Sequence, residues 1–264
     1  MKILFLGDVV GKNGREALKK YLPKLRADYA PDFVIVNGEN ASHGKGLTYN
    51  HYIELSNLGV DAITLGNHYN SKKEIYKYID NATKLVRPLN VKDEYLGGSG
   101  SVVFTKNGVD IRVTNLLGEA FMNMNVGVDD PYSRIILETL DKNPCIHIVD
   151  FHAESTSEKQ ILGYLLDGKV SAVIGTHTHV QTNDARILEK GTAFMADAGM
   201  CGAANGVIGF EKQSVIDKIV FGKSSLFNIS EEDLSIISGV SLDIDEKTFM
   251  CKEITPILIK ERIK

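Results

Sequence analysis

Runs of consecutive apolar residues recur along the chain, and most are followed by a segment whose apolar residues have helical spacing. Residues 2–7 form the first run, and Arg15 to Tyr29 carries the first helical pattern. An apolar run without alternation suits a strand that is buried on both faces of a mainly parallel sheet. The pattern therefore predicts an α/β fold. Further strands of this kind are expected at 33–36, 61–65, 145–151 and 170–174.

Glycine, proline and capping residues set the predicted ends of the helices. Residues 11–14, with a glycine at each end, are expected to form a loop, and Pro23 is expected to kink or divide the helix at 15–29. Further helices are expected from Thr48 to a stop at Gly59, over 72–80, from the Asp130-Pro131 cap to about residue 142, and over 155–166.

Other segments have the pattern of antiparallel strands. Asn107-Gly108 is a strong hairpin signal and joins predicted strands at 101–106 and 109–116. Helix signals fade beyond residue 191, and the glycine-rich segment 198–209 is expected to be a loop that flanks a site. We therefore expect central mixed β-sheets flanked by α-helices in a single domain, residues 1–264. The remaining strands are expected at 192–196, 234–244 and 248–259, the last two as a hairpin.

Composition narrows the classes of protein that fit. The chain has 264 residues, of which 43% are hydrophobic and 24% charged, so it is long enough for one large domain with a full core. Its net charge of −4 and its pI near 6.0 argue against stable binding to nucleic acid, which needs a basic face. A small anionic substrate that is held by metal ions remains compatible with this charge.

The apolar segments and the cysteines indicate the cellular compartment of the protein. The first apolar run is too short for a signal peptide, and the acidic Asp8 follows it directly. No segment approaches the roughly 18 consecutive apolar residues that are needed to cross a bilayer. The three cysteines are an odd number at wide spacing, which argues against a disulfide framework. We expect a cytoplasmic protein with no membrane partner.

Side chains that can bind metal ions follow the predicted strands. Open α/β sheets bind ligands beyond the carboxyl ends of their strands, so these side chains are expected to meet. Gly175 is expected to end its strand, so that His177 and His179 project from the turn to the same side, with the spacing of metal ligands. The candidates are Asp8, Glu39, Asn40, Asn67, His68, His152, His177 and His179.

This donor set fits two metal ions better than one. It holds too many donors for one tetrahedral ion, but it suits two five- or six-coordinate ions that share a carboxylate. Two such ions, about 3.5–4 Å apart, would support hydrolysis of a phosphoester by in-line attack of a metal-bridging hydroxide. His68 lies beside Asn67 and fits the general acid that protonates the leaving group. The donors admit iron, manganese, zinc or cobalt.

The motifs resemble those of the calcineurin-like metallophosphoesterases, in the order of that family. The resemblance implies the layered sandwich of that family. It also implies that Asp8 and His179 hold one ion, that Asn67, His152 and His177 hold the second, and that Glu39 bridges the two. The matching segments are Gly7-Asp8, Gly38-Glu39-Asn40, Gly66-Asn67-His68, His152 and Gly175-Thr-His-Thr-His179.

Two departures from the common pattern resemble a small bacterial branch that is called YmdB-like. Val10 stands where the common family has histidine, and Glu39 stands where it usually has aspartate, with Asn40 as a replacement ligand. This branch often has an acid after the aromatic residue that follows the GNH motif, where this chain has Asn70. The resemblance implies a phosphodiesterase that acts on 2′,3′-cyclic nucleotides, binds iron or manganese and forms homo-oligomers.

Two alternatives remain open from the sequence. The first is a phosphomonoesterase or protein phosphatase of the same fold, because the ions contact only the phosphoryl group. The second is a nucleotide-sensing regulatory protein that keeps the metal site but acts through partners. Such a sensor has no need of His68 as a proton donor, which weakens this alternative.

Overall fold

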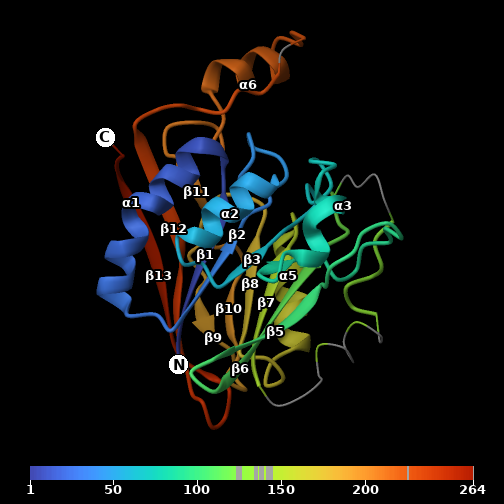
Figure 1. Ribbon diagram of the computed structural model, residues 1–264, viewed down its shortest axis with the longest axis vertical. Helices are drawn as coiled ribbons and strands as arrows, with labels where there is room; N and C mark the ends of the chain where they lie inside the picture. The colour runs from blue at the N-terminus through green and yellow to red at the C-terminus, as the bar shows by residue number, and fades with distance from the viewer. Residues whose placement is uncertain (123–126, 134–135, 137–139, 141–144, 225, 264) are drawn as a thin grey trace.

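The structure, a computed structural model, describes residues 1–122, 127–133, 136, 140, 145–224 and 226–263. Two β-sheets lie against each other, and helices flank them (Figure 1). The described helices are α1 (Gly11–Tyr29), α2 (Tyr49–Asn57), α3 (Ile75–Tyr78), the 3₁₀ turn Ile79–Asn81, α5 (Thr156–Leu165) and α6 (Lys212–Ile219).

Sheet 1 contains the first strands of the chain and its last ones. A parallel core is extended by an antiparallel hairpin, so the sheet is mixed, as expected. Its order is β13 (Cys251–Arg262), β12 (Leu234–Ile244), β11 (Met200–Ala203), β1 (Lys2–Val9), β2 (Phe33–Asn37), β3 (Ala62–Thr64) and β4 (Leu85–Val86).

Sheet 2 is built from the middle of the chain. The hairpin at Asn107-Gly108 is present, and both residues have positive φ, 52° and 79°, which suits a tight two-residue turn. The order is β5 (Ser101–Lys106), β6 (Val109–Leu117), β7 (Ile146–His152), β8 (Ala172–Thr176), β10 (Ala193–Met195) and β9 (Arg186–Ile187).

Alternating side chains of the strands enter different layers of the core. In β1, Ile3 and Phe5 pack between the sheets, in one cluster with Ile148 of β7. Leu4 of the same strand packs on the other face, where α1, α2 and α3 cover sheet 1. Helix α5 covers the outer face of sheet 2. The layered α/β fold expected from the sequence is therefore confirmed.

Several glycines serve close packing where the sequence analysis expected loops. Residues 11–14 are the first turn of α1, and a Cβ at Gly14 would overlap the carbonyl of Cys201. Strand β8 continues through Gly175, where a Cβ would overlap the carbonyl of Ala196. Segment 198–209 contains β11, which pairs with β1. The first two expectations were wrong, because each glycine allows backbones to approach closely, and the third was wrong only for Met200–Ala203.

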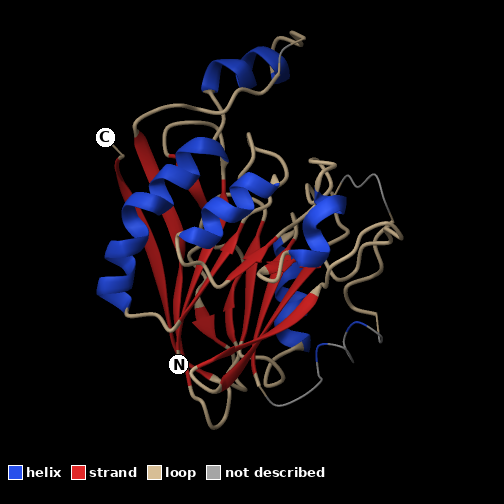
Figure 2. Cartoon of the chain, viewed as in Figure 1, coloured by secondary structure: helices blue, strands red, loops and turns tan. Residues whose placement is uncertain are grey.

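Two helical predictions also differ from the structure. Helix α1 runs through Pro23 as one element, so Pro23 does not divide it. Helix α6 was not expected, and it stands apart from both sheets (Figure 2). The helix predicted up to residue 142 lies largely outside the described residues. Along the described chain, no helix combines the length and the apolar character needed to span a membrane.

Candidate metal centre

The carboxyl ends of strands from both sheets meet at one place, where the candidate side chains lie. Asp8, Glu39 and Asn67 come from the ends of β1, β2 and β3 in sheet 1. His152 ends β7 in sheet 2, and His177 directly follows β8. Because β7 and β8 are parallel with His152 opposite Thr176, these two histidines are brought together by the register of the sheet.

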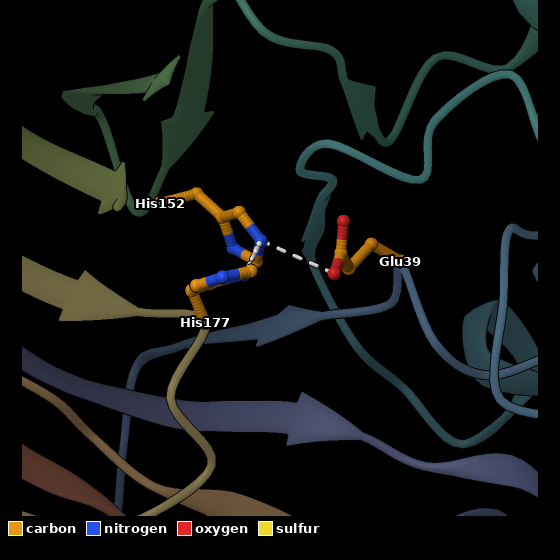
Figure 3. Close-up of side chains that lie close together, drawn as sticks. All are labelled: Glu39, His152 and His177. Atoms are coloured by element: carbon orange, nitrogen blue, oxygen red, sulfur yellow. Dashed lines mark hydrogen bonds and ion pairs between the residues drawn. The ribbon is translucent and has the colours of Figure 1, made fainter. Parts of the chain in front are cut away.

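Three of these side chains form a compact group, which consists of Glu39, His152 and His177 (Figure 3). Nε2 of His152 lies 3.1 Å from Oε1 of Glu39 and 3.0 Å from Nδ1 of His177. The side-chain oxygen of Asn67 also lies 3.0 Å from this nitrogen. Candidate ligand atoms therefore converge on one point at the interface between the sheets.

The outer nitrogens of both histidines are held by polar partners. Nδ1 of His152 lies 2.9 Å from the hydroxyl of Thr176, and Nε2 of His177 lies 3.1 Å from a carboxylate oxygen of Glu154. With a metal ion bound, each imidazole would donate from its outer N–H and present the lone pair of its inner nitrogen. Such outer hydrogen bonds fix the tautomer of metal-binding histidines.

The group of Glu39, His152 and His177 fits a cation by its chemistry. The Nε2 atom of His152 can donate one proton, yet it faces three acceptors, on Glu39, Asn67 and His177. One hydrogen bond cannot satisfy all of them. A metal ion with these ligands would satisfy them together, since nitrogen and oxygen donors of this kind suit divalent transition metals.

Charges inside this group shift the pKa values of its side chains. Burial alone would raise the pKa of Glu39, but the charge and hydrogen bond of His152 outweigh burial and hold that pKa below its usual range. Burial disfavours a charged His152, yet Glu39 and Asp8 raise the pKa of His152 to about 9. Burial and the positive charge of His152 lower the pKa of His177 to about 3. In the metal-free protein, the positive charge of protonated His152 thus occupies the position that a metal cation would take.

A second group lies beside the first and contains Asp8, Asn40 and His179. The amide nitrogen of Asn40 lies 3.1 Å from Nε2 of His179 and 3.4 Å from Oδ1 of Asp8. Nδ1 of His179 donates to the carbonyl of Ile208, so Nε2 presents its lone pair inward. A half-turn of the Asn40 amide would direct its oxygen at the same place. Burial raises the pKa of Asp8, although His179 and His152 act in the opposite sense.

Val10 is buried within contact distance of two glycines and offers no ligand atom. A Cβ at Gly202 or Gly209 would meet the side chain of Val10, so this side chain fills the space beside β11. The polar group next to Asp8 and His179 is instead Asn40. The replacement expected from the sequence thus has a geometric basis.

His68 is joined to Glu39 through its backbone. The N–H of His68 donates to Oε2 of Glu39 at 2.9 Å. Burial lowers the pKa of His68, and the negative Glu39 partly opposes this shift. Gly66 precedes this segment, and a Cβ there would overlap both Glu39 and His152. Glycine at this position is therefore required for the side chains of Glu39 and His152 to meet.

Two buried aspartates support the site and were missed in the sequence analysis. Asp197 pairs with buried Lys159 at 2.8 Å and accepts the backbone N–H of Thr178, between the two histidines of the turn. It follows a predicted strand, as the chosen candidates do, and that position could have identified it. Asp150 lies inside β7, and only its charge within an apolar run marked it.

Known proteins resemble this chain over nearly its whole length. A family profile described as YmdB-like protein matches residues 4–257. The 2′,3′-cyclic-nucleotide 2′-phosphodiesterase of Bacillus subtilis (strain 168) is 46% identical over 264 residues, which cover 99% of this chain and 98% of that protein. The crystal structure of a phosphatase from Mycoplasma pneumoniae has a TM-score of 0.92 at 40% identity, covering 99% and 94% of the two chains. The crystal structure of a hypothetical protein from Thermus thermophilus has a TM-score of 0.90 at 35% identity, covering 99% and 100%.

Proposed function

The chain belongs to the YmdB-like family and is a phosphoester hydrolase, and from that premise we propose that it is a dinuclear metal-dependent phosphodiesterase that hydrolyses cyclic nucleotides, 2′,3′-cyclic nucleotides above all. The observation that carries this proposal is the convergence of nitrogen and oxygen donors from both sheets on Nε2 of His152. The similarity to the 2′,3′-cyclic-nucleotide phosphodiesterase of Bacillus subtilis supports the substrate class.

The proposed ligands divide into two sets that share a carboxylate. Glu39 contacts His152 through Oε1 and also lies 2.9 Å from Asn40, which supports its role as the bridge. When bound, two iron or manganese ions, with zinc as an alternative, would activate water for in-line attack and neutralise the phosphoryl oxygens. One set is Asp8, Asn40 and His179, and the other is Asn67, His152 and His177.

We assign His68 as the general acid. Its backbone N–H donates to Glu39, the charges of Glu39 and His152 act on its imidazole, and no ligand role is needed for it, which supports this assignment. Burial lowers the pKa of His68, but the negative charge of Glu39, to which the phosphate of a substrate would add, favours its protonated form. His68 would then give its proton to the departing alkoxide oxygen of the cyclic phosphate.

A substrate panel tests this function directly. Purified protein loaded with Mn²⁺ would be assayed with 2′,3′-cyclic AMP, 3′,5′-cyclic AMP and p-nitrophenyl phosphate. We expect the highest kcat/KM for the 2′,3′-cyclic nucleotide. Faster cleavage of the monoester would favour a phosphomonoesterase, and the similar Mycoplasma pneumoniae protein is named a phosphatase. Binding of nucleotides without turnover would favour a sensor.

Other expectations from the sequence stay predictions. These are a single domain over residues 1–264, a homo-oligomer, a cytoplasmic location and the absence of stable nucleic-acid binding. Light scattering of the purified protein tests the oligomer, and a gel-shift assay with duplex DNA and RNA tests the last point.

A further inference from the structure

Asp150 is a fully buried carboxylate that accepts hydrogen bonds from strands of both sheets. It lies on β7, two residues before His152. Its Oδ1 accepts from the hydroxyl of Thr176 on β8 at 2.6 Å. Its Oδ2 accepts from the amide of Asn37 on β2 at 3.0 Å and from the hydroxyl of Thr64 on β3. Each of these strands leads into a segment that carries a proposed metal ligand.

The contact with Thr176 determines which nitrogen of His152 faces the site. The threonine hydroxyl has one proton, and the carboxylate of Asp150 takes it, since a carboxylate can only accept. The hydroxyl oxygen must then accept from Nδ1–H of His152, 2.9 Å away. Nε2 of His152 is consequently the nitrogen that meets Glu39, Asn67 and His177.

The contact with Asn37 holds the segment of Glu39 in place. The amide nitrogen of Asn37 is shared between Asp150 and the carbonyl of Leu65, so its oxygen is turned the other way. That oxygen accepts the backbone N–H of Glu39 at 3.1 Å. Asp150 is therefore linked through one intermediate side chain to the backbone of Glu39, whose carboxylate is the proposed bridge.

We propose that Asp150 is a positioning residue for the metal centre, which fixes the tautomer of His152 through Thr176 and the segment of Glu39 through Asn37. This inference rests on the proposed function only in that both need the same metal ions. Asp150 touches neither ion nor substrate in this role. Outer hydrogen bonds of this type affect metal affinity by about 10–100-fold.

The test compares Thr176→Val, which keeps the shape of the side chain but removes the hydroxyl, with Thr176→Ser, which keeps the hydroxyl. Asp150→Asn is the third variant. Mn²⁺ affinity is measured by competition with a chelator, and thermal unfolding is recorded with and without Mn²⁺. We expect Thr176→Val and Asp150→Asn to bind Mn²⁺ about 10–100-fold more weakly, and Thr176→Ser to restore most of the affinity. At saturating Mn²⁺, the KM for 2′,3′-cyclic AMP should stay unchanged.

Wild-type affinity in both Thr176→Val and Asp150→Asn would overturn the inference. So would loss of the fold in both variants that saturating Mn²⁺ does not reverse, because Asp150 would then serve the fold alone. A wild-type protein that hydrolyses the cyclic nucleotide while the variants bind Mn²⁺ normally would refute this inference and leave the proposed function intact. If the wild-type protein lacks that activity but the variants bind Mn²⁺ more weakly than it does, the proposed function is refuted and this inference stands.

Discussion

Nδ1 of His177 lies 3.0 Å from Nε2 of His152, and both nitrogens are turned inward by polar partners on the far side of their rings. The parallel pairing of β7 with β8 produces this contact, because it sets His152 opposite Thr176. The chemistry of the site therefore depends on the sheet register and on a few buried polar groups behind the ligands.

Replacing His68 with alanine should reduce turnover without removing metal. Its contact with Glu39 is made by the backbone N–H, which alanine keeps. We expect kcat for 2′,3′-cyclic AMP to fall about 10²–10⁴-fold, the usual contribution of a general acid. Elemental analysis should find the metal content unchanged. His43→Ala, which removes an exposed histidine, is the matched control. Full turnover in His68→Ala with metal retained would show that another group is the acid.

Metal affinity should fall as the pH is lowered below about 9. In the metal-free protein Glu39 helps to raise the pKa of His152 to about 9, and a metal ion must displace that proton. The apparent dissociation constant for Mn²⁺ should therefore rise about tenfold per pH unit below this value and level off above it. Chelator competition over a pH series measures the slope. An affinity independent of pH would show that His152 is not protonated in the metal-free site.

The same pKa shift predicts the opposite trend for the stability of the metal-free protein. A histidine whose pKa is raised by folding from 6.5 contributes stability that is fully present below pH 6.5. That contribution is lost as the pH rises through about 9. Urea unfolding in the presence of a chelator measures it, and His152→Gln should remove the pH dependence. Stability that increases over this range would contradict the proposed pairing with Glu39.

Gly66→Ala should disrupt the centre although it adds only a methyl group. The new Cβ would overlap Oε2 of Glu39 and Nε2 of His152, so these two side chains would have to separate. We expect metal affinity to fall by at least about 10–100-fold, as it does when ligand orientation is lost. Gly127→Ala is the control, since its Cβ would meet only the flexible side chain of Lys92. Equal metal content in both variants would count against the geometry described for this site.

Breaking the buried pair of Lys159 and Asp197 should destabilise the fold. Lys159→Met leaves a buried aspartate without its partner, which costs about 3–5 kcal/mol. The exposed pair of Lys92 and Asp129 has a similar distance, 2.9 Å, and Asp129→Asn should cost less than about 1 kcal/mol. Urea unfolding measures both. Similar losses in the two variants would mean that Lys159 is more accessible to water than its burial indicates.

The candidate ligands could be selected from the sequence because each follows a strand. The position of Asp8 after an apolar run, for example, requires only the pattern of one segment. Asp150 escaped this reasoning because its role depends on Thr64 and Thr176, which are far away in the sequence and meet it only when both sheets are assembled. The roles of the ligands stay proposals, whereas the layered fold and the family are confirmed.

Elements with a weak periodic signal were the ones missed. Helix α6 spans only eight residues, and its apolar residues Val215, Ile216 and Ile219 are too short a stripe to separate a helix from a loop. Strand β11 was hidden by glycines that make close contacts: a Cβ at Gly199 would meet Ser238 and Gln181, and a Cβ at Gly202 would meet the side chain of Val10. A local sequence pattern cannot distinguish a glycine that bends the chain from one that allows a neighbouring segment to pack closely against it.

The proposed ligands are drawn from the two sheets, with Glu39 and Asn67 on one side and His152 and His177 on the other. Ions bound there would act as a cross-link between layers that are otherwise joined by apolar packing and by the hydrogen bonds of Asp150. Metal binding would then stabilise the folded state, and a chelator would lower the stability of the protein at the same time as it stops catalysis.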